Sequence, residues 1–258
     1  QPSLRAVNEL GTRAGSESIS GICPSNLDYR DYKLRVIDEV MLILQPDGIY
    51  FDHLSFPTEL DDICPYMHIA QSRNYCFCSQ CLASFSEHAT IELPEDLTPA
   101  ETNEWILDNY LNAWIQWKTG SITNFLEEAK IHVHDINPAC KIMVSVLPWK
   151  EEEHNRGRQR IAGQDIRTMA PFTDSFILKT SCHIPDNVYD EIRLSLLSEI
   201  ENTGSKIIPT IRLEIDPPPS AEKAFQNSLH HFKHRVIVSD WGYLLKNRRY
   251  LNILITEP

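Results

Sequence analysis

A carboxylate and an imidazole stand at the end of one short apolar run in this sequence. The segment Gly48–His53 reads Gly-Ile-Tyr-Phe-Asp-His, which indicates a buried strand ending in Asp52 and His53. Parallel barrels keep their catalytic groups at the carboxyl ends of the strands. Asp52 is therefore our first candidate for a catalytic carboxylate; an aspartate that caps a loop is the alternative. If the strand stays regular, His53 points to the opposite face, where it would support the substrate site rather than act as a base.

Acid–base chemistry at Asp52 requires a second carboxylate, because one group protonates a leaving oxygen while the other attacks or activates water. Our choice is Glu214. Thr210, Arg212 and Glu214 alternate along one expected strand and therefore share a face. Asp240, at the end of the last expected strand, is the reserve candidate. The alternative for Glu214 is a position on a solvated loop.

Three cysteines within six residues form a second cluster of chemical interest. Cys76, Cys78 and Cys81 supply three thiolates on one tight turn, which a tetrahedral zinc ion with bonds of about 2.3 Å can collect. Cys64 is our preferred fourth ligand, since it needs no contact across the mouth of the fold. Cys23 is the alternative, and His68 is a weaker substitute. Because the spacing does not determine the fourth ligand, a reduced and metal-free cluster is the competing interpretation.

Strand-like and helix-like segments alternate along the chain, which is typical of parallel strands joined by crossover helices. Helical periodicity marks segments at 34–44, 122–133, 188–200 and 221–232. Seven strands are expected, at Leu4–Asn8, Ile19–Cys23, Gly48–His53, Lys141–Leu147, Ser175–Thr180, Lys206–Leu213 and Arg235–Trp241.

This alternation predicts an α/β fold of the (β/α)8 TIM-barrel type, for which 258 residues are an appropriate length. Seven strands are one short of a closed barrel, so we expect the first strand and its helix to lie upstream of Gln1. The strand at 48–53 then becomes the fourth. We expect residues 1–258 to form a single domain with a Cys-rich insertion at 57–101. A doubly wound open sheet is the structural rival, but no GxGxxG turn follows any expected strand.

The order of these parts resembles a family of TIM-barrel glycoside hydrolases. In that family the fourth strand carries a D-G-I-H-x-D-x-x-x-Y-P type of motif, and this chain has Asp-Gly-Ile-Tyr-Phe-Asp at 47–52 with a proline at position 57. A C-x-C-x-x-C-x-x-x-F segment follows at 76–85, and then a Trp-rich helix with Trp114 and Trp117. The chain departs from the family at 53–56, where aromatic and basic residues are usual, so the resemblance does not specify a sugar.

The resemblance implies a hydrolase that cleaves a glycosidic bond with two carboxylates and no catalytic cofactor. Asp52 would be its nucleophile or its general acid. The Cys-rich segment is also similar to the zinc cluster of certain bacterial beta-galactosidases, which lies after the fourth strand and takes a fourth cysteine from elsewhere. Iron–sulfur radical chemistry is disfavoured, because it uses a C-x-x-x-C-x-x-C run near the first strand.

Several further side chains are expected around a sugar. Trp241 and Trp149 follow strands and would stack on the apolar face of a ring, unless they pack under loops. Lys179 and Arg212 are the cations expected to hold the carboxylates ionised. Asn8 would line the mouth of the site. Asn8 and Glu9 form an Asn-Glu pair, which resembles the pair that ends the fourth strand and carries the acid/base in many sugar-cleaving barrels. Six expected strands follow this pair here, so we reject the acid/base role for it.

Composition narrows the classes of partner. The formal charge of -12 would repel phosphate backbones and anionic membrane surfaces, so nucleic acid and membrane are not expected partners. No apolar stretch is long enough to cross a bilayer, which predicts a soluble protein. An odd count of 7 cysteines does not fit a disulfide framework and favours the cytoplasm, although the sequence does not name the compartment or the oligomeric state. A TIM barrel that binds carbohydrate or another ligand without turnover is the alternative function.

Overall fold

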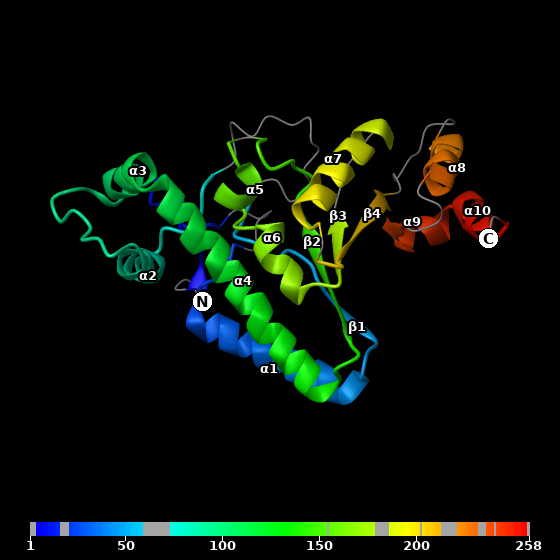
Figure 1. The fold of residues 1–258 in the computed structure, drawn as a ribbon, viewed down its shortest axis with the longest axis horizontal. Coiled ribbons are helices and arrows are strands. Elements are labelled where there is room, and N and C mark those ends of the chain that lie inside the picture. Colours follow the sequence, from blue (N-terminus) through cyan, green and yellow to red (C-terminus); the bar gives the residue numbers. More distant parts are fainter. Residues whose placement is uncertain are drawn as a thin grey trace.

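The computed structural model describes most of the chain, and Figure 1 shows its arrangement. The described residues are 4–15, 21–58, 73–153, 155–178, 186–201, 203–212, 221–231, 236–239 and 241–256.

Five parallel strands form the centre of the molecule, in the order β1-β2-β3-β4-β5. They curl into a half-barrel. Each strand pairs with the next one along the chain, for example Gly48 with Lys141 and Ser175 with Lys206. A doubly wound sheet reverses its strand order at a switch point. The order of the described strands has no such reversal, which excludes that rival for this sheet. The strands are β1 Gly48–Phe51, β2 Lys141–Val146, β3 Ser175–Leu178, β4 Lys206–Arg212 and β5 Ile237–Ser239.

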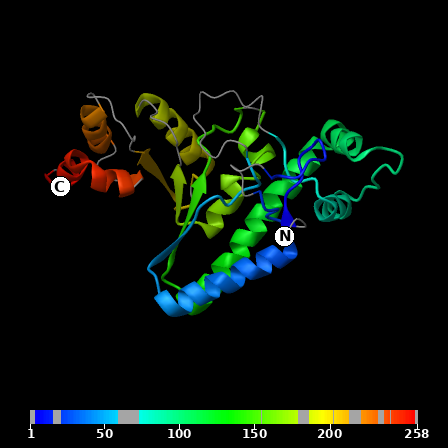
Figure 2. The same ribbon diagram turned by 180° about the vertical axis from the view of Figure 1, so that it is seen from behind.

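Helices connect these strands and cover the sheet (Figures 1 and 2). None of the described helices has both the length and the apolar character that crossing a membrane requires. The helices are α1 Leu27–Leu44, α2 Ser79–Ala89, α3 Pro99–Asn109, α4 Leu111–Ile136, α5 Gly157–Arg160, α6 Ile166–Met169, the 3-10 turn η3 Ala170–Phe172, α7 Asp186–Glu199, α8 Ala221–His231, α9 Trp241–Lys246 and α10 Arg248–Thr256.

The long helices α1 and α4 lie side by side next to the start of the sheet (Figures 1 and 2). The side chain of Asn26 caps α1 by accepting a hydrogen bond from the backbone of Tyr29. One face of α1 buries Ile37 and Met41, as the helical periodicity of the sequence predicts. This packing places the first turns of α1 opposite the end of β1.

The last five expected strands are confirmed, and among the described ends those of β1 and β2 fall one or two residues short of the expected ones. β1 stops at Phe51 because the chain turns at His53, whose φ of 54° is left-handed. β5 spans Ile237–Ser239, and Trp241 begins α9 instead of ending a strand.

The first two expected strands were predicted wrongly as members of the parallel sheet. Within 4–15 and 21–58 the first segment forms only isolated antiparallel bridges, such as Arg5 with Ile22. Gly11, with a φ of 78°, reverses the chain, and Ala14 then donates its backbone N–H to the carbonyl of Ala6. A local reversal of this kind lets backbone N–H and carbonyl groups form hydrogen bonds within the segment, without a neighbouring strand of the sheet. The described sheet is therefore a half-barrel of five strands rather than seven strands of a closed barrel.

The Cys-rich segment between β1 and β2 packs against α4. The ring of Phe77 stacks on Trp114 with centroids 4.5 Å apart, and Trp117 donates its indole N–H to Ser84 at 3.1 Å. The Trp-rich helix and the cysteines therefore belong to one core. The extent of the insertion at 57–101 and the single domain over 1–258 stay predictions.

Candidate functional site

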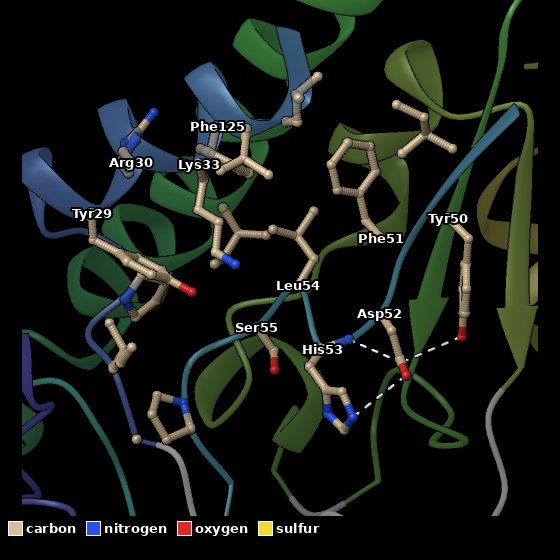
Figure 3. A pocket seen from close by; sticks show the side chains of 18 of the residues that line it. Tyr29, Arg30, Lys33, Tyr50, Phe51, Asp52, His53, Leu54, Ser55 and Phe125 are labelled. Carbon is tan, nitrogen blue, oxygen red and sulfur yellow. Dashed lines mark hydrogen bonds and ion pairs between the residues drawn. The ribbon is translucent and has the colours of Figure 1, made fainter. Parts of the chain in front are cut away.

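A pocket of about 470 Å³ lies beside β1, between the end of this strand and helices α1 and α4 (Figure 3). Asp52, His53 and Ser55 lie on one side, and Tyr29 and Lys33 reach toward them from α1. The lining residues are Gly21, Ile22, Pro24, Tyr29, Arg30, Lys33, Val36, Ile37, Ile49, Tyr50, Phe51, Asp52, His53, Leu54, Ser55, Pro57, Thr58, Ile122 and Phe125. The pocket thus combines one carboxylate with cationic and aromatic groups.

Asp52 is held by donors from its own segment. Its Oδ1 accepts the backbone N–H of His53 at 3.0 Å and the hydroxyl of Tyr50 at 3.4 Å. Hydrogen bonds to a carboxylate stabilise its negative charge. Burial raises the pKa of Tyr50 to about 12, and the negative charge of Asp52 acts in the same direction. Tyr50 therefore remains a proton donor to Asp52 at neutral pH.

His53 lies on the same side as Asp52, which corrects the expectation of opposite faces. That expectation required a regular strand, but the strand ends at Phe51 and the left-handed turn brings His53 Nε2 to 3.5 Å from Asp52 Oδ2. The imidazole is 54% exposed. The backbone N–H of His53 also reaches Ser145 Oγ on β2, at 3.1 Å. The turn that carries Asp52 is thereby fixed to the neighbouring strand.

The α1 side of the pocket carries two cations beside aromatic rings. Arg30 pairs with Glu128 at 3.0 Å and lies 5.6 Å from the ring centre of Phe125. The ammonium of Lys33 lies 5.3 Å from the ring centre of Tyr29. Rings and charges in one pocket suit a polar ligand that also has apolar faces.

Asn8 and Trp149 are placed away from this pocket. Asn8 Oδ1 accepts the backbone N–H groups of Leu10 at 3.1 Å and Thr12 at 2.9 Å, so the side chain holds a turn. The ring of Trp149 is fully buried against Ile161. Packing under a loop, the alternative for Trp149, is what the structure shows, and no face of this ring is open to a sugar.

The remaining predicted site residues lie outside the described part of the chain, or their side chains do. Lys179, Glu214 and Asp240 are not among the described residues. Arg212 ends β4 and Trp241 begins α9, with side chains that are not described. Their roles, including the pairing of Glu214 with Asp52, stay predictions. Conversely, Tyr29 and Lys33 were not predicted, because a helix facing a pocket has the same amphipathic pattern as a helix facing a core.

Four cysteines meet at a second site. The Sγ atoms of Cys23, Cys76, Cys78 and Cys81 all lie within 4.8 Å of one another. A tetrahedral metal ion with Zn–S bonds of about 2.3 Å requires sulfur atoms about 3.8 Å apart, so a small closure of the group satisfies that geometry. Cys23, the alternative fourth ligand, therefore joins Cys76, Cys78 and Cys81 at this site. Cys64, the preferred candidate, lies outside the described residues.

The backbone around these cysteines suits thiolates. Cys78 occupies the N-cap position of α2 and Cys81 lies in the first turn of this helix, where the helix dipole favours negative charge. The backbone N–H of Val7 points to Cys76 Sγ at 3.5 Å. Hydrogen bonds from the Cys23 thiol lower the pKa of Cys76 and of Cys78. The four cysteines therefore fit a soft divalent metal such as zinc.

One lysine lies fully buried beside the cysteine segment. The ammonium of Lys118 on α4 bonds to the carbonyl of Tyr75 and to Asn74 Oδ1, directly before Cys76. Burial lowers the pKa of Lys118 to about 7, while the negative charge of Cys76 acts against this effect.

Fold and site together define a partial parallel α/β barrel with a pocket at the carboxyl end of a strand. Among solved structures, the PgaB (BpsB) glycoside hydrolase domain from Bordetella bronchiseptica is similar, with a TM-score of 0.63 over 96% of this chain and 68% of that chain. The identity is 10%, so this likeness shows the fold alone. No protein-family model and no curated protein matches the sequence.

Proposed function

We propose that this protein is a glycoside hydrolase-like enzyme that cleaves a glycosidic bond at the pocket beside β1. The observation that carries this proposal is Asp52. It is a carboxylate at the carboxyl end of a parallel strand, held by Tyr50 and His53 and opening onto a pocket with aromatic rings. Barrel enzymes place their chemistry at this end of the strands.

Asp52 would act with a second carboxylate. Two hydrogen-bond donors stabilise its charge, which suits a nucleophile or a base better than an acid. Glu214 is the proposed partner and Asp240 its reserve, since both follow strands whose carboxyl ends lie on the same side of a parallel sheet. Of the other proposed site residues, Lys179 follows β3, Arg212 ends β4, and Trp241 lies two residues after β5. A separation of about 5 to 10 Å between the two carboxyl groups is workable for hydrolysis.

The proposed substrate is a carbohydrate. Tyr29 provides an aromatic ring against which a sugar can pack, while Lys33 and Asp52 provide hydrogen bonds to hydroxyl groups. No nucleic acid partner is proposed, given the net charge of -12.

The four-cysteine site is proposed to bind one structural zinc ion. Cys23, Cys76, Cys78 and Cys81 would hold it, and zinc would supply cross-links between the first segment of the chain and the start of α2. Four thiolate ligands leave no open coordination position for substrate, so the ion would have no catalytic role.

Hydrolysis can be tested by screening the purified protein on a panel of aryl glycosides and oligosaccharides, alongside Asp52→Asn. We expect turnover that falls by about 100-fold or more in Asp52→Asn, with ligand affinity largely kept, because the amide preserves the volume but not the charge. Asp47→Asn is the matched control, since Asp47 precedes the same strand at its opposite end. Equal turnover in Asp52→Asn and Asp47→Asn would contradict the role of Asp52.

A non-catalytic carbohydrate-binding barrel is the second candidate. It is favoured by the fact that Asp52 is the one carboxylate among the described residues that line the pocket. If the protein binds a sugar, turns over no glycoside, and binds it identically as Asp52→Asn, the binding function replaces the enzyme.

A further inference from the structure

Lys118 is buried in a way that calls for a physical explanation. Its side chain is fully buried, in the middle of α4, and its ammonium has four oxygen acceptors within hydrogen-bonding distance. All four oxygens are uncharged, and among the described residues no carboxylate accepts a hydrogen bond from this ammonium. The acceptors are Asn74 Oδ1 at 3.2 Å, the carbonyl of Tyr75, the carbonyl of Arg160 at 3.0 Å and that of Ile161 at 2.8 Å.

A buried ammonium of this kind needs negative charge nearby. Neutral hydrogen bonds replace part of the lost hydration, but an isolated charge inside a protein is strongly disfavoured unless an opposite charge compensates it. The cysteine site supplies such a charge. Four thiolates around a divalent ion carry a net charge of about -2, and the chain runs from Tyr75, which Lys118 binds, directly into the ligand Cys76.

We propose that Lys118 is a positioning residue of the metal centre, which balances the charge of the four-cysteine site and joins it to the pocket. This inference rests on the proposed metal site. By holding the carbonyl of Tyr75 and the amide of Asn74, Lys118 fixes the backbone from which Cys76 projects.

The same ammonium reaches the segment that follows Asp52. It lies 4.5 Å from the ring centre of Phe56, a distance at which a cation and an aromatic face attract. The backbone N–H of Phe56 donates to the carbonyl of Ala162 at 2.9 Å, next to Ile161, which Lys118 also binds. The neighbours of Phe56 on both sides, Ser55 and Pro57, line the pocket.

A second connection runs through Cys23. This cysteine stands between Ile22 and Pro24, and both of these residues line the pocket. Metal bound to Cys23 would therefore fix one part of the pocket directly, while Lys118 fixes the part that follows Asp52. Loading of the metal and the shape of the pocket are coupled through these two contacts.

Metal binding to Lys118 variants tests this inference. We expect Lys118→Met to bind Zn(II) about 10- to 100-fold more weakly in competition with a chelator, as is typical when a residue supporting metal ligands is lost. The cobalt-loaded variant should also show altered thiolate-to-metal absorption. Lys118→Arg keeps the charge and should recover most of the affinity. Lys130→Met is the matched control, since Lys130 is a half-buried lysine on the same helix that bonds to the carbonyl of Pro171 and not to the cysteine segment.

Hydrogen exchange on the wild-type protein keeps the inference testable if Lys118→Met fails to fold. Metal should increase protection of residues 53–58 and 159–163 as well as of the cysteine segments. Unchanged affinity and cobalt absorption in Lys118→Met, or protection confined to the cysteine segments, would overturn the role of Lys118 while leaving the metal site intact. A wild-type protein that binds neither Zn(II) nor Co(II) would overturn the metal site and this inference together.

Discussion

At the scale of single residues, Asp52 depends on partners within two positions of it. Tyr50 and His53 both contact its carboxylate, and Ser145 on the next strand binds the backbone of His53. The sequence predicts Asp52 from its place at the end of an apolar run. It does not predict the contact with His53, because that contact depends on a left-handed residue where strand periodicity implies an extended one.

Removing the hydroxyl of Tyr50 tests the support of Asp52. Tyr50→Phe should lower kcat/KM by about five-fold, because one hydrogen bond of roughly 1 kcal/mol to the carboxylate is lost. With a pKa raised to about 12 by burial, the Tyr50 hydroxyl stays protonated, so the loss should be the same from pH 6 to about pH 9. Steady-state kinetics across this range measure it.

Tyr32→Phe is the control for that prediction, since Tyr32 is an exposed residue on α1 outside the pocket. Equal kcat/KM for Tyr50→Phe and wild type would mean that the hydroxyl does not support catalysis.

The aromatic and metal-ligating residues show the limit of reasoning from single positions. Trp149 follows a strand, as a sugar platform would, yet its ring is fully buried against Ile161. Cys23 joins the cysteine trio although more than fifty positions separate it from Cys76. Both outcomes depend on contacts between distant segments, which the spacing of residues along the chain does not contain.

At the scale of elements, the alternation of strands and helices from position 48 onward was predicted well. Parallel strands buried on both faces appear as continuous apolar runs, which are easy to recognise. The structure of the first segment was predicted less well. Leu4–Asn8 is apolar enough for a strand of the sheet, but the chain reverses at Gly11 and the segment forms local antiparallel bridges instead. A short apolar run predicts burial and leaves the direction of pairing undetermined.

Asp174 connects the start of β2 to the turn before β3 through hydrogen bonds, and the strength of this connection should depend on pH. The carboxylate accepts the backbone N–H of Ile142 at 2.9 Å and the ammonium of Lys141 at 3.0 Å. Partial burial opposes its ionisation, but these two donors hold the pKa of Asp174 below its ordinary value. A carboxyl group whose pKa is lower in the folded state stabilises the protein above the unfolded pKa, near 4, and loses this contribution as pH falls.

Asp174→Asn should therefore lower the free energy of unfolding at pH 7 by about 1 kcal/mol, the contribution of one such hydrogen bond. The difference from wild type should shrink as pH falls from about 5 to 3, where the wild-type carboxyl becomes protonated. Urea unfolding at several pH values measures this. Asp31→Asn removes an exposed helix pair with Arg35 and serves as control. A difference that stays constant with pH would contradict the charge-based explanation.

At the scale of the whole molecule, the sheet and the cysteine site stabilise different parts of the structure. The five strands and their crossover helices form the half-barrel, which buries Ile142, Val144 and Phe176. The cysteines join the first segment of the chain to α2, and α2 packs on α4 through Phe85 and Trp114. Metal loss should therefore affect the pocket and the cysteine segments before it affects the sheet.

Removal of the metal ligands should lower the local stability of the cysteine segments without lowering that of the sheet. Cys78→Ser with Cys81→Ser should abolish Zn(II) binding, measured as metal per chain by elemental analysis, because two of the four thiolates are lost. The local structure around residues 21–26 and 73–90 should then open at a lower free energy than the sheet, since a metal site stabilises the segments that it connects. Limited proteolysis should cut the variant in these segments first, while circular dichroism still shows a cooperative transition of the remaining fold.

Cys140→Ser is the matched control for this variant, because Cys140 is a buried cysteine next to β2 and outside the cluster. It should keep its metal and the wild-type cleavage pattern. Protein that lacks metal and still resists proteolysis between residues 73 and 90 would contradict the stabilising role, because the packing of Phe85 and Trp114 on α4 would then be sufficient to hold the segment.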